Sequence, residues 1–296
     1  MAAQSAPSTR AARRGSPAPL RRAGRVAYQL VIVAVAVVIS YPAVWMVLST
    51  FKPSNQIIAQ VNPIPREWTL ANYETALQGI GGVPFWTYLS NSLILAVLSA
   101  IGVVLSSSVT AYAFARVRFP GRQLWFAIMI GTLLLPMHVV IIPQYIMFNQ
   151  LGWVNTFIPL LIGRVLATEA FFVFLMVQFL RTIPTELDEA ARIDGAGHLR
   201  TFASIILPLL RPALVTSAIF AFIWSWNDFF GPLLYLKKPG LYTLPLALRQ
   251  FQDQTSISDY GAQMAMAVLA LVPVVLFFLI FQRQIVDGVS TQGLKG

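Results

Sequence analysis

Long runs of apolar residues, separated by short polar segments, form the pattern of this chain. A helix needs about 20 predominantly apolar residues to cross the hydrocarbon core of a bilayer. Six segments meet this length, and each is predicted to be helical because lipid offers no partner for unpaired backbone groups. The six predicted spans cover residues 27–50, 91–115, 124–144, 154–180, 213–236 and 263–282. The expected fold class is an all-α membrane protein with six transmembrane helices.

Composition supports this prediction and argues against several kinds of functional site. Charged residues make up 11% of the chain, against about 25% in ordinary globular proteins. The absence of cysteine excludes disulfides and thiolate catalysis. The two histidines, His138 and His198, lie far apart in the sequence, so we predict no metal site.

The N-terminal segment 1–26 is basic and contains no acidic residue. Its abundance of Ala, Ser and Pro predicts a disordered tail, although transit peptides and signal-peptide n-regions have a similar composition. We favour a cytoplasmic tail next to membrane lipid, because the apolar run that follows is long enough to span and lacks a cleavage site. The net charge of +10 suits nucleic acid, but six arginines lie in this tail, so no nucleic-acid partner is predicted.

The distribution of Lys and Arg predicts the orientation. Fifteen of these residues lie in the two terminal segments and in the connections 116–122 and 181–211, whereas five lie in the alternate connections. By the positive-inside rule, both termini and the loop 181–212 face the cytoplasm.

The cytoplasmic loop 181–212 is the longest polar interruption in the second half of the chain. Thr185 and Asp188 have the spacing of a capping box, and Gly195 stands where a helix would end in a left-handed residue. A second, amphipathic helix is predicted from about His198. The loop is either a solvated interfacial tether or a surface for another protein, to which Glu189 and Asp194 would offer carboxylates; physical reasoning leaves both open.

The spacing of seven residues in this loop matches a known motif. They are Glu189, Ala190, Ala191, Gly195, Ile205, Leu207 and Pro208. This arrangement resembles the EAA loop of the permease subunits of binding-protein-dependent ABC importers. The segments "STFKP", "PREWTLANY", "WSWNDFFGPLLYL" and "QRQIVDGVSTQGLKG" resemble the carbohydrate branch, in particular the smaller maltose-type permease. The resemblance covers residues 27–296, which we take as one transmembrane domain after the tail 1–26.

The resemblance implies a set of partners in a bacterial or archaeal plasma membrane. They are a second permease forming a heterodimer with this chain, two copies of an ATPase subunit, and an external solute-binding protein. In this family the EAA loop docks on the ATPase, which implies a coupling role for Glu189, Ala190, Ala191, Asp194, Gly195 and Ala196. The chain has no phosphate-binding loop motif of the usual kind, so it is expected to bind no cofactor and to be no enzyme. ATP and Mg²⁺ would be used by the ATPase.

Ionisable residues inside predicted spans are costly and are candidates for function. Arg164 and Glu169 lie in the fourth span and Asp228 in the fifth. Five residues correspond to about 140° around a helix, so we expect Arg164 and Glu169 to meet different neighbours.

The tract Trp224, Trp226, Asn227 and Asp228 combines aromatic faces with hydrogen-bonding groups, which suits a polyhydroxylated solute. The alternative is structural, with tryptophans at a membrane interface and a helix break before Gly231. We favour the structural role.

Three other functions remain open at this point. A secondary transporter or channel would also use six spans with intramembrane charges. An intramembrane enzyme would need a nucleophile and base, or a metal cluster, that the sequence does not suggest. Within the importer family, the solute could instead be an amino acid, a polyamine, a phosphonate or glycerol phosphate.

Overall fold

The computed structural model describes residues 18–59, 62–253 and 259–293. Within these ranges the regular structure is helical, apart from one isolated bridge between Ile80 and Val83. This agrees with the predicted all-α class. Four helices are long and apolar enough to cross a membrane, or five if a sharply bent pair is counted as one span.

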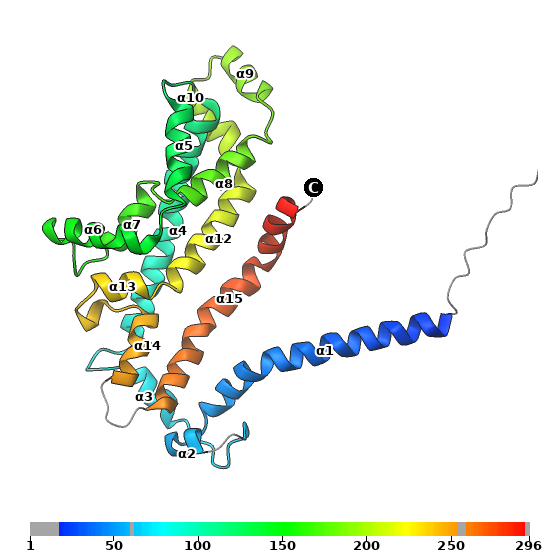
Figure 1. The fold of residues 1–296 in the computed structure, drawn as a ribbon, viewed down its shortest axis with the longest axis vertical. Coiled ribbons are helices and arrows are strands. Elements are labelled where there is room, and N and C mark those ends of the chain that lie inside the picture. The colour runs from blue at the N-terminus through cyan, green and yellow to red at the C-terminus, as the bar shows by residue number, and fades with distance from the viewer. Residues whose placement is uncertain (1–17, 60–61, 254–258, 294–296) are drawn as a thin grey trace, which may run out of the picture.

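A long central helix, α4 (Phe85–Arg116), organises the bundle (Figure 1). It packs against α8 (Ala170–Leu180) and α12 (Arg211–Trp226), while α12 also contacts α15 (Tyr260–Gly293). Small residues make the close approach of α4 and α12 possible, and the hydroxyl oxygens of Ser99 and Ser225 lie 3.1 Å apart. These elements belong to the predicted second (α4), fourth (α8), fifth (α12) and sixth (α15) spans.

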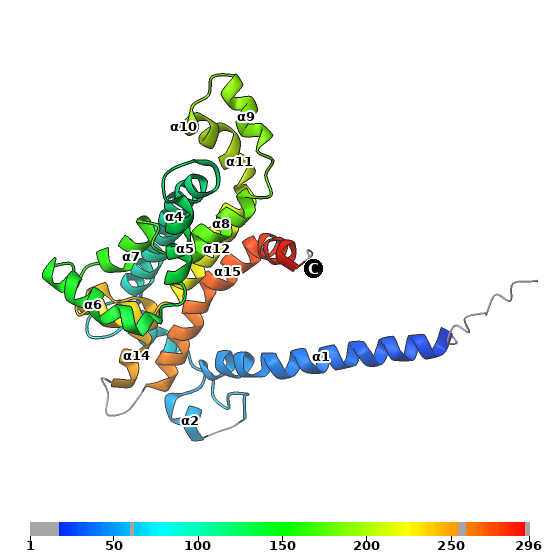
Figure 2. The same ribbon diagram turned by 45° about the horizontal axis from the view of Figure 1, so that its top comes forward.

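The first helix, α1 (Ala18–Ser49), contacts α15 and then runs away from the bundle (Figures 1 and 2). Every residue from 25 to 44 is exposed. The prediction of a disordered tail is wrong for residues 18–26, which belong to this helix. Arginine and alanine are strong helix formers, so the basic run does not end the helix. The rest of the predicted tail, residues 1–17, lies outside the described residues.

The predicted third span is not one continuous helix. The chain forms α5 (Arg122–Thr132), leaves helical geometry before Pro136, and forms α6 (Met137–Gln150), which lies across the direction of α5 in Figure 1. Proline lacks an N–H and restricts the residue before it, so an interior proline commonly ends a helix. Eleven residues of helix cover only about 17 Å, which is too short to span a bilayer.

The fourth and fifth predicted spans are also interrupted. Helix α7 (Ile158–Val165) is separated from α8 by a turn in which Ala167 has a φ of 56°. Helix α12 ends at Trp226, and α13 (Phe230–Tyr235) follows. The fifth span therefore stops well before residue 236, and the predicted break before Gly231 is confirmed.

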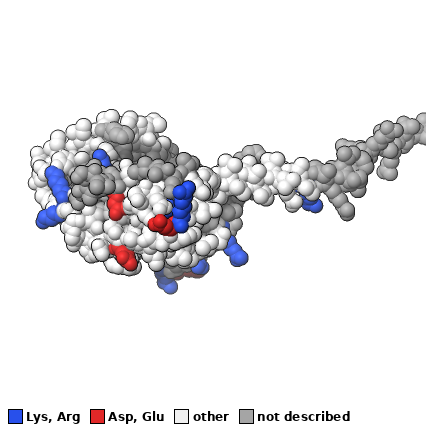
Figure 3. Space-filling view, turned by 90° about the horizontal axis from the view of Figure 1, so that it is seen from below, with Lys and Arg blue, Asp and Glu red and all other residues white. Residues whose placement is uncertain are grey.

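The end of the molecule at the bottom of Figure 1 is formed by short helices. They are α2 (Ser54–Ala59), α3 (Ala71–Gln78), the 3₁₀ turn Pro239–Leu241 and α14 (Leu244–Asp253). Asn72 on α3 connects this helix to the segment that follows α1, because its Nδ2 donates to the carbonyls of Thr50 and Lys52, each at 2.7 Å. Viewed from this side, the described surface is mostly uncharged, with basic and acidic side chains scattered over it (Figure 3).

Candidate functional site

The loop between α8 and α12 protrudes from the opposite end of the molecule. It contains α9 (Glu186–Ile193), α10 (His198–Thr201), a π-helical turn (Phe202–Ile206) and α11 (Leu207–Leu209). Figure 2 shows α9, α10 and α11 projecting beyond the membrane helices. The stretch from His198 to Leu209 meets α12 at an angle of 75°. The two helical segments predicted for this loop are therefore present.

Gly195 ends α9 as the sequence predicted. Its φ is 78°, and its N–H donates to the carbonyl of Arg192 at 3.0 Å. The N–H of Ala196 donates to the carbonyl of Ala191 at 2.8 Å, which satisfies another carbonyl at the helix end. A residue with a side chain is strained in this left-handed conformation, which explains the glycine.

The capping box predicted at the start of α9 is wrong. Thr185 makes no side-chain capping bond. Asp188 is instead turned into the protein, where its Oδ2 lies 3.1 Å from the Nε of Arg116 at the end of α4. A long-range ion pair has replaced the local contact.

Helix α9 has two different faces. Asp188 and Ala191 are buried against the chain, whereas Glu189 and Ala190 are exposed and Ile193 is 87% exposed. The implied role of Ala191 as a docking contact is therefore wrong, because its side chain already packs inside this protein.

The remaining coupling candidates lie at or near the surface. Asp194 and Gly195 are exposed, and Ala196 is half-buried. On α10, Leu199 is 83% exposed, while Ile206 in the following π-helical turn is fully buried. The apolar stripe predicted for this segment is thus divided between an outer and an inner side. The outer side is an unusual position for two large aliphatic residues, Ile193 and Leu199.

Arg164 and Glu169 form an ion pair, with 3.3 Å between Nε and Oε1. The expectation that they meet different neighbours is therefore wrong. The angular argument assumed a continuous helix, but the turn at Ala167 brings the start of α8 back towards Arg164. Ser106 on α4 donates to the carbonyl of Arg164 at 2.7 Å, which fixes this break against the central helix.

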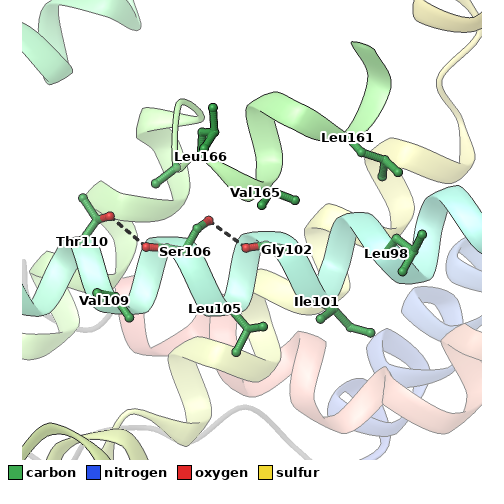
Figure 4. A pocket seen from close by; sticks show the side chains of 11 residues that line it. Leu98, Ile101, Gly102, Leu105, Ser106, Val109, Thr110, Leu161, Val165 and Leu166 are labelled. Carbon is green, nitrogen blue, oxygen red and sulfur yellow. Dashed lines mark hydrogen bonds between the residues drawn. The ribbon is translucent and has the colours of Figure 1, made fainter. Parts of the chain in front are cut away.

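An open groove of about 620 Å³ lies beside this break, between α4 and α7. Figure 4 shows aliphatic side chains around it, with Ser106 and Thr110 at one end. The Ser106 hydroxyl shares its one proton between the carbonyls of Gly102 and Arg164, each at 2.7 Å. The Thr110 hydroxyl donates to the carbonyl of Ser106 at 2.8 Å. A sugar site needs several available polar groups, so this groove lacks the chemistry of one.

The tract at the end of α12 is divided by the helix break. Trp226 is buried and stacks near Phe222, whereas Trp224 is 44% exposed. Asn227 donates to the carbonyl of Ile223 at 2.9 Å, and Asp228 accepts from the N–H of Gly231 at 3.0 Å. These contacts satisfy backbone groups at the break. Of the two tryptophans, Trp224 has the accessible ring.

Together, a bundle of apolar helices, helix breaks fixed by polar groups and a protruding amphipathic loop define a multi-pass helical membrane protein. The sequence matches, over residues 105–291, the family described as the binding-protein-dependent transport system inner membrane component. The chain belongs to this family.

Individual relatives cover nearly the whole chain. The diacetylchitobiose uptake system permease protein NgcG of Streptomyces coelicolor is 32% identical over 277 residues, 91% of this chain and 88% of that protein. The trehalose/maltose transport system permease protein MalG of Thermococcus litoralis is 32% identical over 265 residues, 89% and 94% of the two chains. A chain in the crystal structure of a bacterial ABC transporter involved in the import of alginate has the same fold, with a TM-score of 0.78 and 22% identity over 91% of this chain and 99% of that one.

Proposed function

We propose that this chain is the permease subunit of an ATP-driven carbohydrate importer. It forms half of the translocation pathway and receives the movements of an ATPase through the loop 181–212. The observation that carries the proposal is the outer side of this loop, where Ile193 and Leu199 are almost fully exposed and Glu189 lies on the same short helix. Exposed apolar side chains next to an acidic residue are suited to a protein partner with an apolar groove and a basic rim.

The partner at this loop is a separate ATPase subunit, present in two copies, which uses ATP and Mg²⁺. Glu189 would accept charge-assisted hydrogen bonds from an arginine of that subunit. Ala190, Asp194 and Ala196 would complete the contact surface, and Gly195 would hold the turn. Family membership supports this assignment because these transport systems depend on several components.

The exposed helix α1 supports a second permease as the next partner. Its apolar segment, Arg25–Ser49, is long enough to span a membrane, and every residue from 25 to 44 is exposed within this chain. A heterodimer would cover part of this surface with the other permease, and an external solute-binding protein would dock on the side that carries α2, α3 and α14. In this proposal both termini lie in the cytoplasm of a bacterial or archaeal cell.

A carbohydrate is the proposed solute. The names of two relatives specify diacetylchitobiose and trehalose or maltose, and the transporter of similar fold imports a polysaccharide. Within this chain, Trp224 offers an aromatic face that a sugar ring could contact. Asn227 is exposed beside it, although Trp226 and Asp228 serve the helix break.

Co-purification from the native membrane in mild detergent tests the proposal. The wild-type chain is expected to bring with it an ATPase and a second multi-span protein. Glu189→Ala should weaken ATPase binding by about 2 to 5 kcal/mol, because it leaves a buried cation of the partner unpaired. Gly195→Pro should also release the ATPase, since proline cannot adopt the positive φ of this turn.

The matched control is Glu186→Ala, which removes an exposed carboxylate from the same helix and should retain the ATPase. If the wild-type chain purifies alone and transports solute in vesicles without ATP, the proposal is wrong. The chain would then be a secondary transporter, and Arg164 and Glu169 would be the residues to examine for ion coupling.

A further inference from the structure

Arg116 connects three segments that are distant in the sequence. It is the last residue of α4, and its Nη2 donates to the carbonyls of Leu180 at 3.1 Å and Ile183 at 2.6 Å. Its Nε lies 3.1 Å from the Oδ2 of Asp188 on α9. One guanidinium therefore holds the ends of α4 and α8 and the first turn of α9.

The chemistry of this contact requires arginine. The two carbonyls lie at the end of α8 and just beyond it, where a helix leaves carbonyls without intrahelical donors. The Leu180 carbonyl also accepts from the N–H of Ile183 at 3.2 Å, and Arg116 provides a further donor to both. A guanidinium has five N–H donors in a rigid, planar arrangement, so it can reach carbonyl groups and a carboxylate at the same time. A lysine ammonium would supply the charge without this geometry.

The contact lies in a largely dry environment. The side chains of Arg116 and Asp188 are 8% and 10% exposed. Next to them, the rings of Tyr112 and Phe202 pack at 5.1 Å, and Ile206 is fully buried. Removing one member of such a buried pair leaves an unpaired charge, which is strongly unfavourable.

Asp188 occupies the face of α9 opposite the proposed docking surface. Glu189 and Ile193 point outward, whereas Asp188 and Ala191 point inward. Apolar packing alone lets packed helices slide over one another. Two hydrogen bonds hold the guanidinium to the end of α8. Its contact with Asp188 is an ion pair without a hydrogen bond, and this pair opposes the separation of α9 from the end of α4.

We infer that Arg116 and Asp188 form a rigid joint through which displacement of α9 is passed to α4 and α8. Both are positioning residues, and the inference rests on the proposed function of the loop. The joint makes α9 and the ends of the two membrane helices move as one body when the ATPase changes state.

Distances between spin labels test this joint directly. The chain has no natural cysteine, so labels can be placed at Thr185→Cys, at the start of α9, and Arg118→Cys, just after α4; both positions are exposed. The complete complex, with cysteines of its partner subunits replaced, is measured in lipid nanodiscs without nucleotide and with ATP and vanadate. With Arg116 and Asp188 intact, the distance distribution should be the same in both states.

Breaking the joint should make this distance depend on nucleotide. Asp188→Ala and Arg116→Lys should broaden or shift the distribution when ATP and vanadate bind. Asp188→Asn preserves the side-chain volume and should show a smaller effect in the same direction; it replaces Asp188→Ala if that variant does not assemble. Glu186→Gln, which changes an exposed carboxylate on the same helix, should behave as the wild type.

Two results would overturn the inference. One is a wild-type distance that already changes with nucleotide, and the other is a set of Asp188 and Arg116 variants with unchanged distributions in a complex that hydrolyses ATP. A failure of the proposed function is distinguishable from both, because no ATPase would then co-purify with the wild-type chain.

Discussion

At the scale of single residues, several charged side chains of this protein pair with backbone or side-chain groups where a helix ends or breaks. Arg116 donates to a carbonyl at the end of α8, and Asp228 accepts from an N–H at the start of α13. Arg164 pairs with Glu169 across the turn at Ala167. Each is charged and lies in or beside an apolar bundle, where charges are tolerated only with partners. A charged residue within an apolar run of this chain therefore marks a change in the direction of the backbone.

The Arg164–Glu169 pair leads to a prediction about stability. Arg164→Gln or Glu169→Gln alone should each destabilise the protein by about 1 to 3 kcal/mol. This is below the usual cost of breaking a buried ion pair, because the Glu169 side chain is 32% exposed. The double variant should be close to the wild type. Thermal unfolding of the detergent-solubilised complex measures all four forms.

The double-mutant cycle gives a clear negative outcome. If the effects of the two single variants simply add, the residues are not coupled, and the ion pair contributes nothing to the fourth span. Arg164→Lys is a useful control, since it preserves the charge near Glu169 and should lose less stability than Arg164→Gln.

The sequence shows which charged residues lie in or near the apolar segments, but it does not show which groups they pair with. The spacing from Thr185 predicts a local cap for Asp188, but a buried arginine from α4 provides the contact instead. In the sequence, Arg116 is one of the basic residues whose distribution predicts orientation, and nothing local indicates its contact with Asp188. Long-range pairs of this kind leave no local signal, because nothing in a single sequence states which helices become neighbours.

At the scale of the element, the sequence located the long helices and missed most of their interruptions. Apolar length alone identifies α4 and α15, since burial or lipid contact along the whole helix requires an unbroken apolar run. The breaks depend on different causes. Pro136 is a local signal for a helix end, but a prediction from apolar length alone passes over it. The turn at Ala167 contains neither glycine nor proline and arises from contacts with α4 and from the Arg164 pair.

The glycine turn after α9 allows a closely matched test. Gly195 and Gly197 both have open space where a Cβ would be built, but only Gly195 has a positive φ. Gly195→Ala should therefore cost about 1 kcal/mol, while Gly197→Ala should cost little. Hydrogen exchange of the α9 amides should be about fivefold faster in Gly195→Ala than in the wild type. Equal exchange in the two alanine variants would show that the backbone conformation at Gly195 carries no strain.

At the scale of the whole molecule, the orientation across the membrane is the main prediction that the distribution of charge makes. An even number of crossings places both termini on one side, and the excess of Lys and Arg assigns that side to the cytoplasm. Six crossings would require α5 and α6 to pass the membrane together, since neither is long enough alone.

Single cysteines can test this orientation, because the natural chain has none. His198→Cys in the loop should react with a membrane-impermeant maleimide only after the cells are opened. Gln78→Cys, at the end of α3, should react in intact cells once any outer barrier has been permeabilised. Labelling of both positions from outside would contradict the proposed topology, and with it the docking of an ATPase at α9.

Helix α1 has a consequence for the life of the protein in the cell. Because its residues from 25 to 44 are all exposed, a newly inserted copy carries one long helical segment that is surrounded mainly by lipid. Such a copy is an orphan subunit, recognisable to membrane proteases until its partner arrives. The abundance of this protein is therefore expected to follow the rate at which its partner is synthesised, rather than its own.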